Sequence, residues 1–136
     1  MDTIRRADYF SMQTANKVGE GARLLGGLRE AGVNLLAFTG FPSGRRAQVD
    51  FIPADTAQFR AAARKLKLKV GARKTVFLVQ GDDRVGAIAE ICEKLAGAGI
   101  NMTAMDAVST GDGRYGAIFW VNARDINKAA KVLGAS

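Results

Sequence analysis

The chain has 136 residues, with 20 Lys and Arg against 13 Asp and Glu, which leaves a formal net charge of +7. A hydrophobic fraction of 48% and 24% charged residues of mixed sign are typical of a folded globular protein rather than a disordered one. The chain has no histidine and one cysteine, Cys92, which excludes internal disulfides, the usual zinc ligand sets and histidine-based catalytic triads.

No apolar run approaches the roughly 20 residues that a membrane span needs, and charges at the N-terminus replace the apolar stretch of a signal peptide. We therefore expect a cytoplasmic protein that needs no membrane, no metal and no cofactor.

The first half of the chain predicts a strand, a helix, two hairpin strands, a second helix and a short last strand. Runs of β-branched and aromatic residues place the strands at 8–13, 33–39, 47–52 and 68–70. The first helix has an apolar stripe and ends near Gly32. The second opens at Asp55, with Gln58 three residues later as in a capping box. The stripe of the first helix consists of Val18, Ala22, Leu25 and Leu28.

The second half predicts the same series, with strands at 75–80, 100–106 and 115–121. Its second helix is expected to open at Asn122, with Asp125 three residues later. The chain stops at Ser136, too early for a fourth strand, so the edge of this sheet is either open or filled by the N-terminal segment. The stripe of its first helix consists of Val85, Ile88, Cys92 and Leu95.

An internal repeat links the two halves. Ala31-Gly32-Val33-Asn34 recurs as Ala98-Gly99-Ile100-Asn101, an offset of 67 (101 minus 34) that we expect to hold without gaps. The element order in each half is the split βαβ arrangement. We therefore predict an α+β protein of two tandem ferredoxin-like (βαββαβ) modules, residues 1–70 and 71–136, each with an antiparallel sheet and helices on one face.

Alternation along the strands predicts an apolar open sheet face, opposite the helices. Such a face is usually covered, so we expect a homodimer through it, unless these side chains are only scattered exposed hydrophobes. The expected face consists of Leu36, Phe38, Phe77, Val79, Met105, Ile118 and Trp120.

The turn after each first strand is a candidate binding site. Asn16 and Asp83 are expected to cap the following helices, which places Gly19 and Gly86 in the first helical turn. Glycine there costs helix stability. Two explanations remain open: the close approach of an anion to the free N–H groups of the helix, or tight packing of the helix on a strand.

Two short motifs in the second half resemble the ACT domain family. They are Asp83-Arg84-Val85-Gly86 and Ala98-Gly99-Ile100-Asn101-Met102, and weaker forms stand in the first half as Asn16-Lys17-Val18-Gly19 and Gly32-Val33-Asn34-Leu35. Neither turn has the proline of the usual ACT motif. The resemblance covers nearly the whole chain.

The resemblance implies a non-catalytic regulatory protein that binds a small ligand, most often an amino acid, between ACT modules placed side by side. The regulated protein would be a separate enzyme or regulator chain. An asparagine amide can accept from an ammonium group and donate to a carboxylate, although an asparagine that opens a strand can equally cap a turn. The implied ligand-binding residues are Asn16, Val18, Gly19, Glu20, Asn34, Asp83, Val85, Gly86, Ala87 and Asn101.

Three other functions agree less well with the sequence. Val79-Gln80-Gly81 is similar to the phosphate loop of acylphosphatases, but the expected Phe-Arg is absent and the neighbouring aspartates would repel phosphate, so we expect no enzyme.

Basic residues concentrated between 60 and 74 and a pI near 10.0 are compatible with RNA or polyanion binding, although no RNA-recognition motif is present and nucleic acid is not the favoured partner. A purely structural, oligomerising ACT module is the third alternative.

Overall fold

The computed structural model describes residues 2–136 and divides the chain into two compact units. The first unit is Asp8–Lys74, and the second unit combines the N-terminal residues through Ala7 with Thr75–Ser136. Each follows the order strand, helix, strand, strand, helix with antiparallel pairing, which is the ferredoxin-like α+β pattern. The compact units differ from the expected division at residue 70, because the N-terminal residues group with the second unit.

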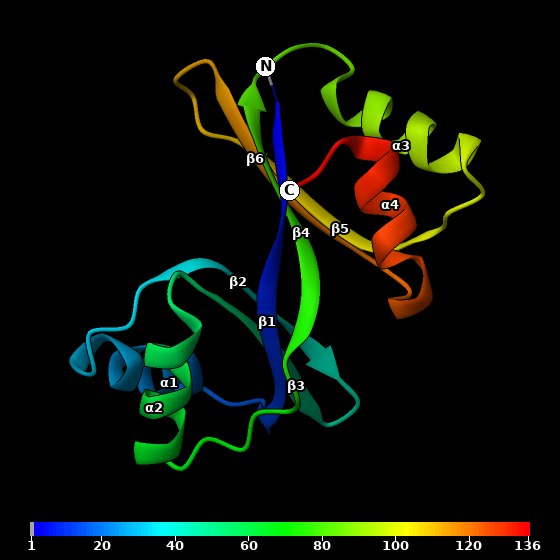
Figure 1. The fold of residues 1–136 in the computed structure, drawn as a ribbon. Coiled ribbons are helices and arrows are strands. Elements are labelled where there is room, and N and C mark those ends of the chain that lie inside the picture. The colour runs from blue at the N-terminus through cyan, green and yellow to red at the C-terminus, as the bar shows by residue number, and fades with distance from the viewer. Residues whose placement is uncertain (1) are drawn as a thin grey trace. The chain divides into compact units, whose positions relative to one another are not determined.

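The first unit has the strand order β2-β3-β1. Its helices lie on one face of the strands (Figure 1). The core on that face contains three aromatic rings, with the Phe10 and Phe59 centroids 5.0 Å apart and those of Phe51 and Phe59 5.3 Å apart. The elements are β1 (Thr3–Ala15, of which Asp8 onward belongs here), α1 (Glu20–Glu30), β2 (Leu35–Ser43), β3 (Arg46–Pro53) and α2 (Thr56–Lys65).

The second unit has the strand order β4-β6-β5, again with both helices on one face (Figure 1). Its core contains the stacked rings of Phe77 and Phe119, with centroids 5.0 Å apart, packed with Ile91 and Leu95 of the first helix. The elements are β4 (Lys74–Asp82), α3 (Ala87–Gly97), β5 (Met102–Ser109), β6 (Arg114–Val121), a 3₁₀ turn (Ala123–Asp125) and α4 (Ile126–Leu133).

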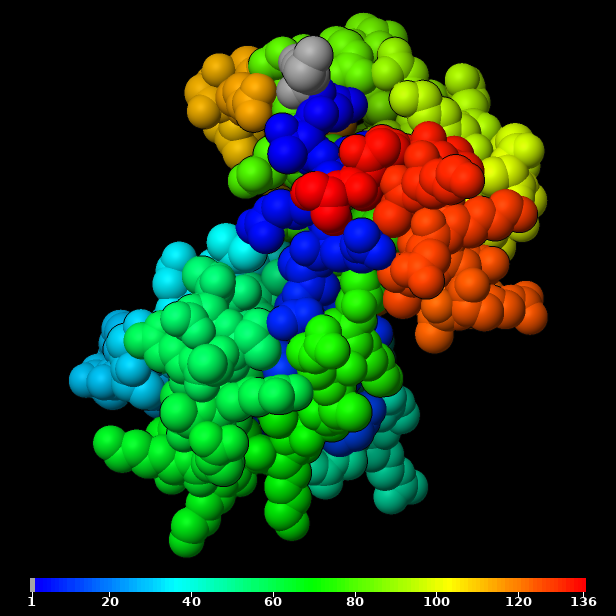
Figure 2. Space-filling model, in the orientation of Figure 1, coloured from blue at the N-terminus to red at the C-terminus, as the bar shows by residue number. Residues whose placement is uncertain are grey.

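The N-terminal segment fills the edge of the second unit, which is one of the two alternatives that the sequence left open. The Ser136 N–H donates to the Ile4 carbonyl at 3.2 Å, and the Arg6 N–H donates to the Ser136 carbonyl at 3.1 Å. Ile4 also packs against the core of this unit. Figure 2 shows the C-terminal residues lying against the N-terminal segment. The first residues of β1 therefore complete the unit that Thr75–Ser136 forms.

A β-bulge changes which side chains face the helices. In each unit it lies early in the second strand, after Leu35 and after Met102. Because an extra residue reverses the alternation beyond it, Phe38 and Met105 pack against the helix-side cores, and their expected place on the open face is wrong.

Phe77 and Val79 also belong to the helix-side core, so their expected place on the open face is wrong as well. Ile118 and Trp120 alternate with the core residue Phe119 and lie on the other face. They are only 7% and 9% exposed in the single chain. Their burial requires no second chain, and the homodimer stays a prediction.

The repeat is not free of gaps. Phe10 pairs with Phe51 in the first unit and Phe77 with Phe119 in the second, so the third strands are related by an offset of 68 (119 minus 51). The hairpin between β5 and β6 is longer than the one that joins Ser43 to Arg46. The offset of 67 returns in the last helices, where Ala62 and Ala63 correspond to Ala129 and Ala130 and all four are buried.

The helix termini confirm some of the expected signals. Asp55 caps α2, because its carboxylate accepts from the Gln58 N–H at 3.0 Å. Asn122 makes no side-chain cap, because a 3₁₀ turn intervenes before α4 begins at Ile126. Among the described residues, no helix is long and apolar enough to cross a membrane.

Candidate functional site

The turn between β4 and α3 ends at Gly86, which is the N-cap of the helix with φ 80°. A Cβ added at Gly86 would meet nothing within 4 Å. The left-handed backbone therefore accounts for the glycine. Tight packing of the helix on a strand does not, because no protein atom lies near the position of a Cβ, and the space beside the turn is open to an anion. The expected cap by Asp83 is wrong, because the left-handed turn starts the helix later, at Ala87.

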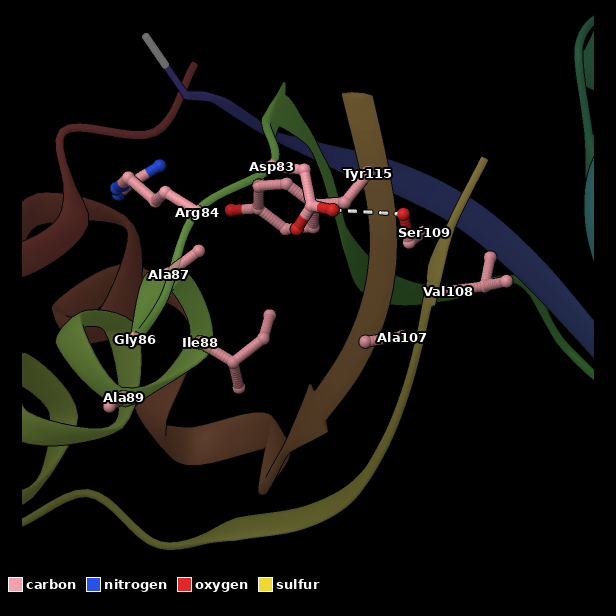
Figure 3. Close-up of a pocket in the computed structure, with 10 residues that line it drawn as sticks. All are labelled: Asp83, Arg84, Gly86, Ala87, Ile88, Ala89, Ala107, Val108, Ser109 and Tyr115. Carbon is pink, nitrogen blue, oxygen red and sulfur yellow. Dashed lines mark hydrogen bonds between the residues drawn. The ribbon is translucent and has the colours of Figure 1, made fainter. Parts of the chain in front are cut away.

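A cavity of about 270 Å³ lies beside this turn. It is bounded by the start of α3, the end of β5 and one side chain of β6, and Figure 3 shows these elements around it. All of its lining residues belong to the second unit. They are Asp83, Arg84, Gly86, Ala87, Ile88, Ala89, Ala107, Val108, Ser109 and Tyr115.

One carboxylate stands at the cavity without a cationic partner among the described residues. The Asp83 side chain accepts a hydrogen bond from Ser109 Oγ at 2.9 Å (Figure 3). The Asp83 N–H donates to the Gly113 carbonyl, also at 2.9 Å. These two contacts fix the turn to the β5–β6 hairpin. Asp83 is exposed, so its negative charge is available to a cation in the cavity.

The start of α3 supplies hydrogen-bond donors to the same cavity. The first N–H that donates to the helix N-cap belongs to Glu90, which donates to the Gly86 carbonyl at 3.1 Å. The amides of Ile88 and Ala89 precede it and have no acceptor within the helix. Together with the positive end of the helix dipole, they favour an anion at this point.

Arg84 is committed to other residues. Its guanidinium binds Asp2 through two hydrogen bonds of 3.1 and 3.2 Å and Glu90 at 2.6 Å. Hydrogen bonding to Arg84 lowers the pKa of Asp2 despite its partial burial. Figure 3 shows the Arg84 side chain directed away from the cavity. The charge that faces the cavity from the turn is therefore that of Asp83.

Tyr115 closes one wall of the cavity and is 6% exposed. Its hydroxyl oxygen is buried and makes no hydrogen bond of good geometry with the described residues. Burial first, and the nearby Asp2 carboxylate second, raise the pKa of Tyr115 to about 12. The side chain therefore stays neutral at physiological pH and adds no charge to the wall.

The structure brings three of the implied site residues of the second half to the cavity, namely Asp83, Gly86 and Ala87. Val85 is fully exposed, at 104%, and is not part of the lining. Its expected place on the buried stripe of α3 is wrong, because the helix begins two residues later than its pattern indicated. Asn101 precedes β5, whereas the cavity uses the last three residues of that strand, so a role for Asn101 would need a neighbouring module and stays a prediction.

Sequence reasoning missed the other seven lining residues. They are Arg84, Ile88 and Ala89 beside the turn, Ala107, Val108 and Ser109 of β5, and Tyr115 of β6. Tyr115 pairs with Gly81 across β4 and β6, and that register would have placed its ring beside the turn. The sequence did not predict this register of β4 and β6, because the hairpin before β6 is longer than the corresponding hairpin of the first unit.

In the first unit, the equivalent turn is built differently. Gly19 is again the left-handed N-cap, with φ 87°, so Asn16 is not the helix cap, and Val18 is 103% exposed. Asn34 is exposed, and its carbonyl accepts from the Ala54 N–H at 3.0 Å. Glu20 is 7% exposed.

Glu20 is already engaged by residues of its own unit. Its carboxylate accepts from Thr14 Oγ1 and forms two bonds with Arg23, at 2.8 and 2.9 Å. These contacts, with Arg23 the larger, lower the pKa of Glu20 to about 2. The carboxylate is therefore ionised and committed to its neighbours.

Over residues 2–136, no three side chains of the metal-binding types stand close enough together to hold a metal ion. The arrangement in the second unit is instead a small cavity with a carboxylate on one side and open backbone donors on the other.

Comparison with known proteins finds a similar family for the part of the chain that contains this cavity. Residues 75–135 match the ACT domain, a stretch that contains every lining residue of the cavity. No curated protein gives a significant match to the chain.

Solved structures agree on the fold. Protein BT0572 from Bacteroides thetaiotaomicron is 18% identical, with a TM-score of 0.83, 96% of this chain covered and 88% of that one. The ligand-free regulatory subunit of aspartate kinase from Thermus thermophilus is 17% identical, with a TM-score of 0.63 and coverages of 98% and 94%. The chain is thus similar in fold to these two structures over nearly its whole length, and residues 75–135 are similar in sequence to the ACT domain.

Proposed function

We propose that this chain is a non-catalytic regulatory protein whose second unit binds a free amino acid in the cavity beside α3. The observation that carries the proposal is the pairing, across one cavity of about 270 Å³, of the Asp83 carboxylate with the open start of a helix. The match of residues 75–135 to the ACT domain supports it.

The two ends of the cavity suit the two charges of an amino acid. The ligand carboxylate would accept hydrogen bonds from the Ile88 and Ala89 amides. The ligand ammonium would bind the Asp83 carboxylate, which Ser109 already orients at 2.9 Å. Ala87, Ala107 and Val108 add small apolar surface for the rest of the ligand. A group with only one of these charges would leave one end unused.

Thermal unfolding in the presence of each of the twenty amino acids tests the proposal. A ligand that binds only the folded state adds about 2.7 kcal/mol of stability at 100 times its Kd, so at least one amino acid should raise the unfolding temperature. Asp83→Asn should remove most of that shift, whereas Asp106→Asn, a change of an exposed aspartate on β5 outside the cavity lining, should leave it intact. A screen in which no amino acid shifts the transition contradicts the proposal.

The proposal extends to the whole chain. We take both units as ACT-like modules, with the expected ligand contacts of Asn34 and Asn101 supplied between neighbouring modules, and a separate enzyme or regulator chain as the regulated partner. We also propose that the chain forms a homodimer. Light scattering should then give a mass of twice 14.4 kDa in solution, and a monomer at all concentrations contradicts that part.

Charge favours polyanion binding as a second candidate function. The first unit has 12 basic and 5 acidic residues, a net +7, whereas the second has 8 of each. Seven exposed basic side chains lie between residues 60 and 74, and of these Arg73 alone has an ion pair among the described residues, with Asp8. Binding of single-stranded RNA that falls steeply with rising salt would support this function, and no binding at low salt would end it.

A further inference from the structure

The two units differ at the residue that opens their first helix. Glu20 opens α1, and Ala87 opens α3 at the equivalent place, 67 residues later. The strand before each helix differs in the same sense, because Thr14 of β1 corresponds to Gly81 of β4. The first unit therefore has polar side chains where the second has the two smallest residues.

The polar residues of the first unit hold an anion. The Glu20 carboxylate is surrounded by donors from Thr14 and Arg23, and its side chain is 8% exposed. In the second unit the residue at the position of Arg23 is Glu90, which pairs with Arg84 instead. The first residue of α1 is thus a carboxylate held by its own unit, whereas the first residue of α3 is alanine, and the carboxylate in the first turn of α3, Glu90, is paired with Arg84.

The ammonium side of the site differs as well. Asp83 and Ser109, which form a hydrogen bond in the second unit, are replaced by Asn16 and Pro42 in the first. Proline has no side-chain donor, and asparagine has no charge. The first unit therefore lacks the negative group that would attract a ligand ammonium.

Space does not account for the difference. A Cβ added at Gly21, the second residue of α1, would meet nothing within 4 Å, so the start of this helix is open to solvent. The N–H groups at this helix start could therefore donate hydrogen bonds to a small anion, because nothing blocks its approach. Glu20 is the first residue of the same helix, and its carboxylate, although paired with Arg23, would oppose a second carboxylate there.

We propose that Glu20 serves as a built-in anion in the first unit, so that each chain binds a single ligand carboxylate, at the start of α3. The idea rests on the proposed function for the identity of the ligand, but not for the comparison between the two helix starts. The two units then have different roles. The first unit holds a permanent internal ion pair, between Glu20 and Arg23. The second unit has a helix start that a ligand carboxylate can occupy.

Amide NMR with sodium acetate as the probe tests this assignment. Acetate supplies a carboxylate without an ammonium group, so the experiment does not depend on which amino acid binds. The Asp83 carboxylate repels acetate and weakens its binding at α3, but Asp83 belongs to the turn, whereas Glu20 is the first residue of the helix itself. In the wild type, acetate at high concentration should therefore still shift the amides of Ile88 and Ala89, whereas those of Gly21 and Ala22 should respond with an affinity lower by about tenfold or more, the scale of one like-charge contact.

Glu20→Gln keeps the shape of the side chain and removes its charge, so the Gly21 and Ala22 amides should then respond to acetate about as Ile88 does. Ala87→Glu should suppress the response at Ile88. Glu30→Gln, which removes the charge of an exposed glutamate at the other end of α1, is the matched control and should change neither response.

Equal responses at both helix starts in the wild type would overturn the assignment, as would a Glu20→Gln chain that gains nothing at Gly21. Glu20→Ala gives a second measurement if glutamine preserves the hydrogen bonds of the cluster. A chain that binds acetate at α3 but no amino acid would refute the proposed function while leaving this inference standing, so the two failures are distinguishable.

Discussion

Glu20 shows how one buried carboxylate ties local sequence to stability. Arg23 lies three residues later on α1, so the pair meets on one helix face, and Thr14 reaches it from the preceding strand. The donors favour the ionised form, which lowers the pKa of Glu20 from 4.5 to about 2.

This lowered pKa predicts a pH dependence of folding. Because the pKa is lower in the folded state than in the unfolded state, the contribution to stability is present above pH 4.5 and is lost as the pH falls towards 2. Urea unfolding of the wild type and of Glu20→Gln should therefore give curves that differ at pH 6 and converge as the pH falls from 4.5 to 2. A difference that stays constant over this range would show that the charge is not involved.

Gly86 gives a second prediction for a single residue. Its φ of 80° favours glycine, and a methyl group there would meet no other atom. Gly86→Ala should therefore lower the free energy of unfolding by about 1–2 kcal/mol, through backbone strain alone.

The matched control is Gly97, in the last turn of α3, where an added Cβ also meets nothing and φ is not in the left-handed region. Gly97→Ala should leave stability unchanged or raise it by about 0.5–1 kcal/mol. Chemical denaturation of both variants measures the difference, and equal effects would contradict the role assigned to Gly86.

The secondary-structure elements show which parts of the fold could be predicted from the sequence alone. Period-two and helical patterns predicted the first five elements of each unit in the right order, and the Asp55 cap was confirmed at 3.0 Å. The short last strand expected at 68–70 is wrong, because the next strand after α2 begins only at Lys74. The face of Phe38 and Met105 was not predictable, because a bulge is a single inserted residue that leaves composition and period almost unchanged. The same limit applies to the cavity, because Tyr115 reaches it through the register of β4 and β6, which a longer hairpin shifts by one residue.

The N-terminal strand supplies a prediction about an element. Ile4 packs on the core of the second unit although it precedes Thr75 by 71 positions in the sequence (75 minus 4). Ile4→Ala should lower the free energy of unfolding by about 1–2 kcal/mol, below the range for fully buried isoleucines because Ile4 is only partly buried.

Thr3 is exposed on the same strand and provides the control. Thr3→Ala should change stability by less than about 0.5 kcal/mol. Hydrogen exchange should then show faster opening of β4 and β6 amides in the Ile4 variant, and an effect restricted to the first unit would contradict the assignment of this strand.

At the scale of the whole molecule, the two units share the order of their elements but differ in charge and in polar contacts. The first unit carries the entire net charge of +7 and an internal carboxylate, Glu20. The second unit is neutral and carries the cavity with Asp83 beside the start of α3. The sequence already indicated this division of charge, because basic residues concentrate between 60 and 74. It did not predict the contacts of Glu20 and of Asp83, because these depend on how strands and helices meet in the fold.

The central claim is that the cavity of the second unit binds both charges of a free amino acid, and calorimetric titration tests it most directly. The amino acid with the largest thermal shift should be titrated beside its N-acetyl and α-amide forms, which lack the ammonium and the carboxylate charge respectively. Each derivative should bind at least about tenfold more weakly, a loss of about 1.4 kcal/mol, and Asp83→Asn should weaken the free amino acid but not its N-acetyl form. Equal binding of all three compounds, or binding that Asp83→Asn leaves unchanged, would contradict the account.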